Sequence, residues 1–402
     1  MRVSEVLQLY AEGRRDFHRK NLRSLSFKGK DLSGADFSEA DIRGANFSKA
    51  NLTGAKFVGA KAGLPKRWVI TLLFCCLVLL VISSFLTVFF GVFVVYITSP
   101  KPEEAVLGWV ALVAFLGFGF LSFYRGINAS ASASAFAIAI AIASASASIL
   151  LYSYLGWRAI KGDPRDAWIR TIAIAFAATG GTNFRYANLT DTDFTKATLK
   201  NSDFRDAILT RTCFKGTKKL DFARPGKTYL NIPQVRDLVI KGQGQDKNFE
   251  RLNLQGINLR GANLADANFI SADFSNANLQ DADLSRAKLV QTQLDKTDFT
   301  GATLTGAYIE DWGITRGTKF DGVRCEYVYM RLPTKYNPDP FRKPDNNEEF
   351  FADGEFGDFI KPIVDTLDLY HNQNVDPRAI AIAFKQLAEN HPEAELEIVA
   401  IE

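Results

Sequence analysis

The residues that most often carry catalysis are few and scattered in this chain. His18, His371 and His391 are the only histidines, and none belongs to the HExxH motif of metalloproteases. No serine or cysteine lies in the GxSxG sequence that marks the nucleophile of many hydrolases. The four cysteines have neither the CxxC spacing of a metal site nor the pattern of a disulfide framework.

Two short polar stretches resemble ligand loops without completing them. The sequence GQGQDK at 242–247 lacks the third glycine and the flanking strand of a dinucleotide site. The sequence DNNEEF at 345–350 begins like a calcium loop, but Phe350 replaces its essential glycine. The sequence therefore predicts no catalytic residue, no metal site and no cofactor, and a protein that is not an enzyme.

A period of five residues dominates the sequence. An apolar residue stands at every fifth position from Leu22 to Phe57, again from Phe184 to Phe214, and again from Phe249 to Ile314. Alanine often stands two residues before this apolar residue, so that the unit is A-[DN]-[LF]-x-x, as in ADFSE and ANLTG. Such regularity over 29 units is the signature of a repeat architecture.

A period of five fits neither a helix nor a strand, because both would scatter the apolar residues over several faces. It fits a chain that turns a corner every five residues, so that four units close a square coil. Coils stack at about the strand spacing of ~4.8 Å, and the Asp or Asn before each centre suits the turns. The predicted repeat centres that fill the interior include Phe27, Phe37, Phe47, Phe57, Leu189, Phe194, Phe204, Leu264, Phe269, Phe274, Leu279 and Leu284. The predicted small inward positions include Ala35, Ala40, Ala45, Ala267, Ala272 and Ala277.

These units resemble the pentapeptide-repeat family. The resemblance implies a right-handed quadrilateral β-helix, here interrupted by an α-helical transmembrane domain and followed by a small α/β C-terminal domain. Some units depart from the pattern at the alanine position, where looser coils are expected, and the array is expected to end near Trp312. The hydroxyl residues at that position are Thr182, Thr192, Ser202, Thr212, Thr292 and Thr297.

The repeats divide the chain into segments. An amphipathic helix at residues 3 to 12, within the segment 1–21, is expected to cap the first array. The predicted arrays are residues 22–61, 182–214 and 249–320, and the small C-terminal domain is 345–402. The insertion 215–248 preserves the phase of five between Phe214 and Phe249. This favours a loop and a short helix, about Pro233 to Lys241, that project from one continuous stack, and a domain break is the weaker alternative.

A membrane region is predicted at 66–181, where the array is expected to stop because Phe57 and Phe184 are not separated by a multiple of five residues. Residues 69–97 contain no charge and exceed the roughly 20 residues that a membrane span needs. Further spans are predicted at about 106–124 and 135–157, with 167–181 as a doubtful fourth. An even number of crossings, two or four, would leave both ends of the region on one side, and four are preferred to two.

Lys66 and Arg67 precede the first span, and the first 67 residues carry 14 Lys and Arg against seven Asp and Glu. The positive-inside rule therefore places the repeats in the cytoplasm of a multi-pass integral membrane protein. The region 135–157 alternates alanine with isoleucine or serine, and a surface segment is the alternative to a span there.

The prediction for function is a non-enzymatic membrane-anchored scaffold that binds the lipid bilayer and unidentified protein partners. The resemblance to cyanobacterial membrane members of the family implies a role in envelope lipid deposition or in uptake regulation. One alternative is a DNA mimic that binds DNA gyrase, as some family members do. Residues 249–320, however, carry nine acidic against seven basic residues, too few for such mimicry, and no nucleic-acid partner is expected. An accessory role in membrane transport is the other alternative.

Overall fold

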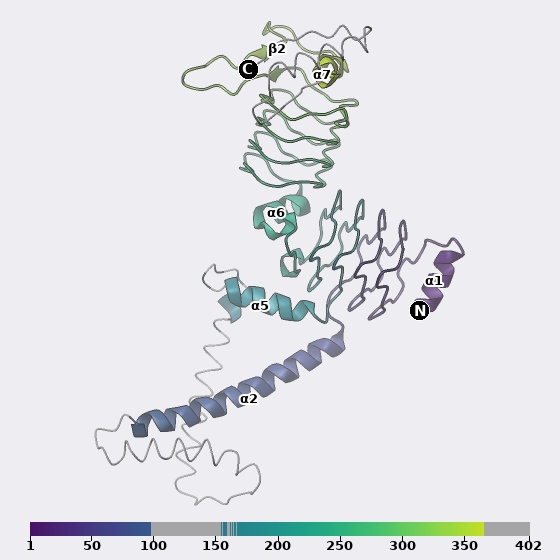
Figure 1. Cartoon of the computed structure of the whole chain (residues 1–402), viewed down its shortest axis with the longest axis vertical. Coiled ribbons are helices and arrows are strands. Elements are labelled where there is room, and N and C mark those ends of the chain that lie inside the picture. The colour runs from purple at the N-terminus through teal and green to yellow at the C-terminus, as the bar shows by residue number, and fades with distance from the viewer. Residues whose placement is uncertain are drawn as a thin grey trace, which may run out of the picture.

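The computed structural model describes residues 1–97, 154, 156–158, 161, 163, 165 and 167–365, and most of these form two stacks of short coils (Figure 1). The predicted spans at 106–124 and 135–157 lie outside the described residues, apart from the end of the second. The helices and strands are α1 (Val3–Ala11), α2 (Lys66–Ile97), α5 (Ala167–Ala178), η2 (Leu220–Phe222), η3 (Tyr229–Asn231), α6 (Pro233–Lys241), β1 (Val328–Tyr329), β2 (Arg342–Lys343) and α7 (Glu355–Asp365).

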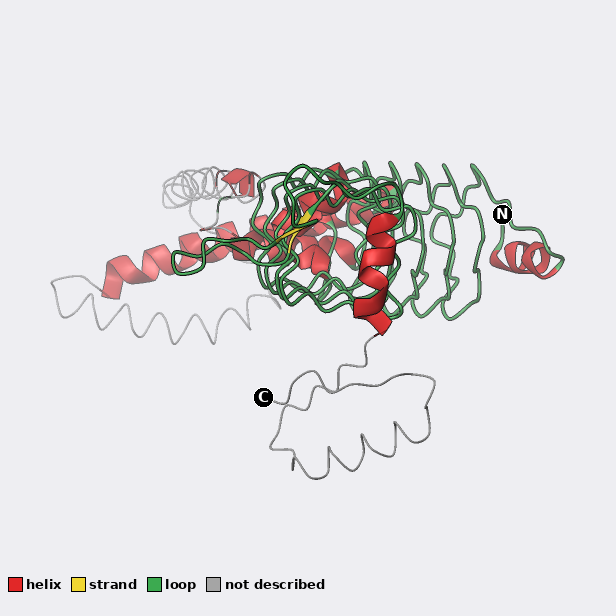
Figure 2. Ribbon diagram, turned by 90° about the horizontal axis from the view of Figure 1, so that it is seen from above, coloured by secondary structure: helices red, strands yellow, loops and turns green. Residues whose placement is uncertain are grey.

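Each coil of the stacks takes 20 residues. Parallel β-bridges join Asp16 to Asp36 and Asp36 to Lys56, so four five-residue units complete one turn. Repeat centres from successive coils lie above one another inside, as do Phe17 and Phe37, whose stacked rings are 5.5 Å apart. This is the four-sided coil that the period of five predicts (Figure 2).

The corners follow from local chemistry. The Asp36 carboxylate accepts a hydrogen bond at 2.8 Å from the backbone N–H of Ser38, and Asp or Asn does the same in most units. Two residues after each centre the backbone turns through the left-handed region, with φ of 65° at Gly34 and 56° at Glu39. Glycine and polar residues tolerate this conformation best, which explains the fifth position of the repeat.

Threonine at the alanine position does not loosen the coils, contrary to the sequence expectation. The Thr192 hydroxyl donates to Leu52 O at 2.8 Å, and the Thr297 hydroxyl donates to Phe274 O at 2.8 Å. Each bond ties one coil to the coil above, because a backbone carbonyl has a second lone pair to offer. The hydroxyl of Ser202 is buried without such a partner.

The β-ladder of the first stack continues directly from the repeats before the predicted membrane region to the repeats after it. The expectation that the array stops after Phe57 is therefore wrong. Asn46 bridges Asn183, and Lys61 bridges Thr198. Bridged residues are 137 apart here instead of 20, so 117 residues are inserted at one corner of a coil. The Phe47 and Phe184 rings stack across the insertion at 5.4 Å, the same spacing as elsewhere in the stack. A length of 117 is not a multiple of five, which is why the phase changes.

The two stacks are separate, so the expectation of one continuous stack is also wrong. The first ladder ends with the bridge from Asp203 to Arg224, and the second begins with the bridge from Gln243 to Asn263. Helix α6 lies between the stacks, which meet at an angle (Figure 1). Val235 and Leu238 of α6 are fully buried, so the helix fills the joint and does not project from it.

Helices close the outer ends of both stacks. Val6 of α1 is fully buried at the start of the first stack, whose interior begins at Phe17, one unit before Leu22. The second stack passes the expected end near Trp312 and continues to the bridge from Tyr308 to Tyr329. An extra residue enters this last coil, since bridged residues there are 21 apart.

The described part of the predicted C-terminal domain covers the end of the second stack. Strands β1 and β2 pair antiparallel, and Val328 of β1 is fully buried. Phe356 and Ile360 of α7 are buried in the same apolar core as the repeat centres. Residues 345–365 therefore belong to the stack as its cap, and the rest of the predicted C-terminal domain, residues 366–402, lies outside the described residues.

Candidate functional site

The insertion leaves and re-enters the first stack at one corner, which the Thr182 hydroxyl holds together. This hydroxyl accepts from the backbone N–H of Gly63 and donates to Ile42 O, both at 2.9 Å. Gly63 lies just before the insertion and Thr182 just after it, and both are buried. The Thr182 hydroxyl therefore holds both ends of the 117-residue insertion to the coil above them.

Two glycines at this corner leave no room for a side chain. A Cβ at Gly181 would lie 1.8 Å from Asn201 O, and a Cβ at Gly63 would lie 2.4 Å from Lys200 O. Gly63 also has a φ of 121°, which L residues rarely adopt. The five-residue unit 199–203 thus packs directly against the backbone of both ends of the insertion.

Helix α2 begins at this corner and carries apolar side chains into solvent. Ile70, Leu73, Phe74 and Leu77 are among its exposed residues, and α2 extends away from the stacks (Figure 1). Within the described residues, α2 is the one helix long and apolar enough to cross a membrane. Its 32 residues correspond to about 48 Å at 1.5 Å per residue, more than the ~30 Å hydrocarbon core.

Helix α5, which leads back into the corner, does not have the features of the doubtful fourth span at 167–181. Its 12 residues cover only about 18 Å. Arg170 of α5 donates from Nη2 to the Asp221 carboxylate at 3.0 Å, and its guanidinium lies 5.3 Å from the centre of the Phe222 ring. These contacts dock α5 against η2 of the first stack.

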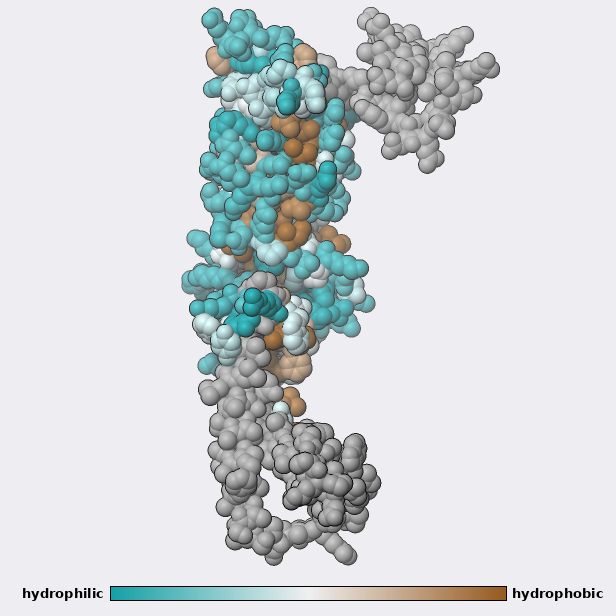
Figure 3. Space-filling model, turned by 90° about the vertical axis from the view of Figure 1, so that its left-hand side faces the viewer, coloured by the Kyte–Doolittle hydropathy of each residue, from teal (hydrophilic) through white to brown (hydrophobic). Residues whose placement is uncertain are grey.

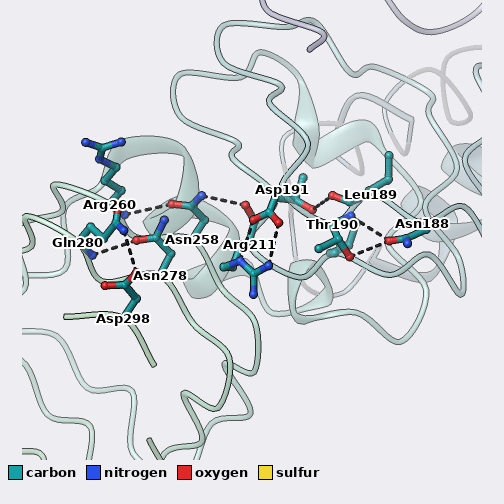
Figure 4. A network of polar contacts seen from close by, with 12 residues as sticks. Asn188, Leu189, Thr190, Asp191, Arg211, Asn258, Arg260, Asn278, Gln280 and Asp298 are labelled. Carbon is teal, nitrogen blue, oxygen red and sulfur yellow. Dashed lines mark hydrogen bonds and ion pairs between the residues drawn. The ribbon is translucent and has the colours of Figure 1, made fainter. Parts of the chain in front are cut away.

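The two stacks touch at a polar corner (Figure 4). Arg211 forms an ion pair with Asp191 at 2.7 Å within the first stack. Its backbone N–H donates to Gly256 O at 2.6 Å, and its carbonyl accepts from Asn258 Nδ2 at 2.9 Å. Arg211 thus joins a coil of one stack to a coil of the other.

A cleft of about 750 Å³ opens beside this corner, between the last coil of the first stack and the first coils of the second. Its lining is about half polar and half apolar, and hydroxyls and side-chain amides come from Thr210, Asn253, Gln255 and Asn276. Burial raises the pKa of the Tyr229 hydroxyl, which donates to Leu209 O at the wall of the cleft. Groups of this kind suit hydrogen bonding to a ligand and offer no activated nucleophile.

Three charged residues, Arg170, Asp221 and Arg236, connect helix α5 with helix α6. Burial lowers the pKa of the Arg236 guanidinium, and the neighbouring Arg170 lowers it further, while Asp221 opposes both effects. Arg236 donates from Nε to Leu230 O at 2.9 Å. Asp221 therefore partly neutralises two arginines that belong to different helices.

The sequence-predicted interior residues lie inside the stacks. Of the predicted repeat centres and small inward positions, all have side chains that are fully buried. They belong to one apolar core cluster that also includes residues of α6 and α7. In the part of the chain that the structure describes, no three His, Cys, Asp or Glu residues gather as metal ligands.

The residues that close the insertion corner were not identified as a site from the sequence. Thr182 was noted only as a departure from alanine, and Gly63 and Gly181 fall outside the repeat pattern. The pairing of Arg170 with Asp221 joins residues 51 apart, which periodicity cannot reveal. The sequence does contain a signal for this corner. Thr182 belongs to the first repeat unit after the insertion, and Gly63 follows the last repeat unit before it.

We predict that Thr182→Val destabilises the first stack more than Thr192→Val. Valine keeps the shape but leaves the buried Gly63 N–H unpaired, which costs about 1–3 kcal/mol. Thr192→Val removes only a second bond to Leu52 O, which Ala55 N–H still satisfies, and should cost about 1 kcal/mol. Denaturant midpoints of the detergent-purified protein measure both effects. Equal losses of stability in the two variants would show that the Thr182 hydroxyl stabilises the first stack no more than the Thr192 hydroxyl does.

The fold and this corner define a class: a β-helical repeat protein with a long apolar insertion in one coil. The family model described as pentapeptide repeats matches the three arrays, at residues 21–62, 180–218, 248–281 and 277–311, in eight copies. No curated protein sequence matches this chain.

Several solved structures of pentapeptide-repeat proteins are similar to this chain. HetL, involved in heterocyst differentiation regulation in the cyanobacterium Nostoc sp. strain PCC 7120, is 15% identical, covers 81% of this chain and 92% of its own, and has a TM-score of 0.20. QnrB1, a plasmid-mediated fluoroquinolone resistance protein, is 14% identical over 77% of this chain and 92% of its own, with a TM-score of 0.21. Rfr23 from the cyanobacterium Cyanothece 51142 is 22% identical over 23% of this chain and 94% of its own, with a TM-score of 0.11. No functional conclusion follows from TM-scores at this level.

Proposed function

We propose that this protein is a non-enzymatic scaffold anchored in a membrane, with both stacks on the same side of the bilayer. The observation that carries the proposal is the unbroken β-ladder across the insertion, from Asn46–Asn183 to Lys61–Thr198. Because both ends of the insertion belong to one coil, any path through a bilayer must return to the side where it started. The number of crossings is then even.

Charge and surface character support this arrangement. Lys66 and Arg67 stand at the start of α2, and the positive-inside rule assigns that end to the cytoplasm. The face of the stacks seen in Figure 3 is mainly hydrophilic, in contrast to the exposed apolar side chains of α2. The stacks would then stand in water as rigid bodies held close to the membrane, where partner proteins could bind their sides and the cleft at the joint.

The biological process is a further part of the proposal. The resemblance to cyanobacterial membrane members of the family suggests envelope lipid deposition or uptake regulation. The DNA-mimic alternative is not favoured, because the first stack and its flanks contain an excess of basic residues and the second stack is nearly neutral. Arg170, paired with Asp221, gives no support to a transport path.

Membrane fractionation and protease protection test the proposal. The full chain with epitope tags at both ends should resist extraction by alkaline carbonate, and both tags should be digested from the same side of membrane vesicles. Leu73→Lys combined with Leu77→Lys should release the protein, because each buried lysine costs about 3 kcal/mol at a span centre. Ile208→Lys, at an exposed position of the stack, is the matched control. Tags on opposite sides, or a wild-type protein that carbonate extracts, would overturn the proposal.

A further inference from the structure

Helix α5 presents an apolar stripe away from the stacks. Trp168, Ile172 and Phe176 are 64%, 59% and 59% exposed, and their spacing of four residues places them on one face. Thr171 and Thr179, the residue after α5, lie on this side, and their hydroxyls donate to Ala167 O and Phe176 O. Both hydroxyl donors on this side are therefore already hydrogen-bonded to the backbone.

The opposite face of α5 is fixed to the stack. Arg170 donates to both the carboxylate and the carbonyl oxygen of Asp221, at 3.0 and 3.3 Å. Ala178 is buried at the end of the helix, next to the closed corner at Gly181. These contacts hold the orientation of α5, so the apolar stripe keeps its outward direction.

The stripe adjoins the start of α2. A Cβ at Gly180, just after α5, would lie 2.8 Å from the ring of Trp68 in the first turn of α2. The exposed apolar surface of α2 begins at Trp68 and Ile70, so apolar side chains extend from one helix to the other.

Aromatic and basic residues come together on the segment just before α5. Lys161 Nζ lies 4.3 Å from the ring centre of Trp157, and the Arg158 guanidinium lies 5.6 Å from that of Tyr154. Both rings are about half exposed. Tryptophan and tyrosine beside lysine and arginine are typical of the boundary between lipid headgroups and acyl chains.

We propose that α5 lies in the headgroup–acyl boundary of the same bilayer, with its Trp168–Ile172–Phe176 stripe toward the acyl chains. This proposal rests on the membrane anchoring proposed above and identifies where the protein meets the lipid. Interfacial helices of this kind bury their apolar face by roughly 5–10 Å while their polar face stays outside. Here the polar face is occupied by the stack itself, so α5 fixes the stack against the membrane surface.

The position of α5 also limits the number of crossings. If α5 stays in the interface, all crossings lie between the start of α2 and residue 166. Their number must still be even, so the three predicted spans at 69–97, 106–124 and 135–157 cannot all cross. We infer two crossings, in place of the four preferred from the sequence.

Quenching of tryptophan fluorescence by brominated lipids tests this inference in the full chain. The protein is reconstituted in nanodiscs of mixed phosphatidylcholine and phosphatidylglycerol, with bromine either near the headgroup or near the chain ends. The emission of Trp168 is taken as the difference from Trp168→Phe, and Ile172→Trp in that background reports the middle of α5. Leu77→Trp reports α2 about 17 Å from its first residue, near the bilayer centre. Ile208→Trp, exposed on the first stack, is the control outside the bilayer.

The expected result is that the tryptophans at 168 and 172 lose more emission to the shallow bromines than to the deep ones. The tryptophan at 77 should show the reverse, and that at 208 should lose none. Stronger deep than shallow quenching at 172 would mean that α5 crosses the bilayer, and no quenching at 168 and 172 would mean that protein covers the stripe. Either outcome overturns the inference while quenching at 77 upholds the anchoring. Absence of quenching at 77 would overturn the membrane anchoring itself.

Discussion

Gly181→Ala is expected to prevent the insertion from closing onto the first stack. The new methyl carbon would lie 1.8 Å from Asn201 O and 3.0 Å from the carbonyl carbon, so the backbone of one coil must move. Asn201 cannot move freely, because its N–H donates to Phe222 O and its coil is bridged on both sides. Overpacking against backbone costs about 1–3 kcal/mol or more, and we expect the upper end here.

The displacement should spread along α5. Ala178 and the Arg170–Asp221 ion pair lie within about three turns of Gly181, so a shift of the backbone at Gly181 should displace both. Proteolysis of the detergent-purified protein should therefore show new cleavage near residues 178–182, together with a lower denaturant midpoint. Gly357→Ala in α7 is the matched control, because nothing lies within 4 Å of its Cβ and alanine favours a helix by about 1 kcal/mol. Similar midpoints and digestion patterns for the two variants would contradict the closed corner.

The interior of the stacks could be predicted from the sequence because the signal is local and repeated. Every fifth residue must point inward once four units close a coil, so Phe27 and Phe274 could be placed without knowing which coils are neighbours. The hydrogen bonds of the turns are also local, since Asp36 and Ser38 are two residues apart. Periodicity of this kind determines the side-chain direction of each unit.

Which coils are neighbours could not be predicted, because that depends on contacts across large gaps. Asn46 pairs with Asn183 after 137 residues, and nothing in either unit indicates the other. The change of phase between Phe57 and Phe184 looked like the end of an array, although a coil tolerates an insertion of any length at a corner. In the opposite case, the phase is preserved between Phe214 and Phe249, yet the ladder breaks there and α6 fills the joint. Phase is thus a poor guide to whether two arrays share a stack.

The threonine positions show a second limit of the pattern. Threonine is larger than alanine by a methyl group and a hydroxyl, and a hydroxyl is costly to bury without a partner. In the structure the partner is a backbone carbonyl of the coil above. The Thr212 hydroxyl, for example, donates to Leu189 O at 2.8 Å. That acceptor is available only because coils stack in register, a property of the assembled fold.

Phe194→Asp is expected to have the largest effect of any single change in the first stack. The Phe194 ring stacks on Phe57 at 5.1 Å and on Phe214 at 5.6 Å, and its side chain is fully buried. Removing such a ring costs about 3–5 kcal/mol. A carboxylate without a partner in that interior adds several kcal/mol more. The sum is comparable to the whole stability of an ordinary domain, about 5–15 kcal/mol, so the first stack should not fold. Phe194→Leu, which copies Leu189 and Leu199 at equivalent positions, should fold with a loss of about 1 kcal/mol.

Because the two stacks have separate ladders, we expect the unfolding caused by Phe194→Asp to stop at α6. The second stack has its own ladder from Gln243 to Tyr329, with α6 at one end and α7 at the other, and no β-bridge among the described residues joins it to the first. Phe194→Asp should therefore leave a protease-resistant second stack, and Phe274→Asp should leave a resistant first stack with its insertion. Mass spectrometry of the digests distinguishes the two fragments. Loss of both stacks in both variants would instead mean that the few bonds around Arg211 and α6 make one cooperative unit of the whole rod.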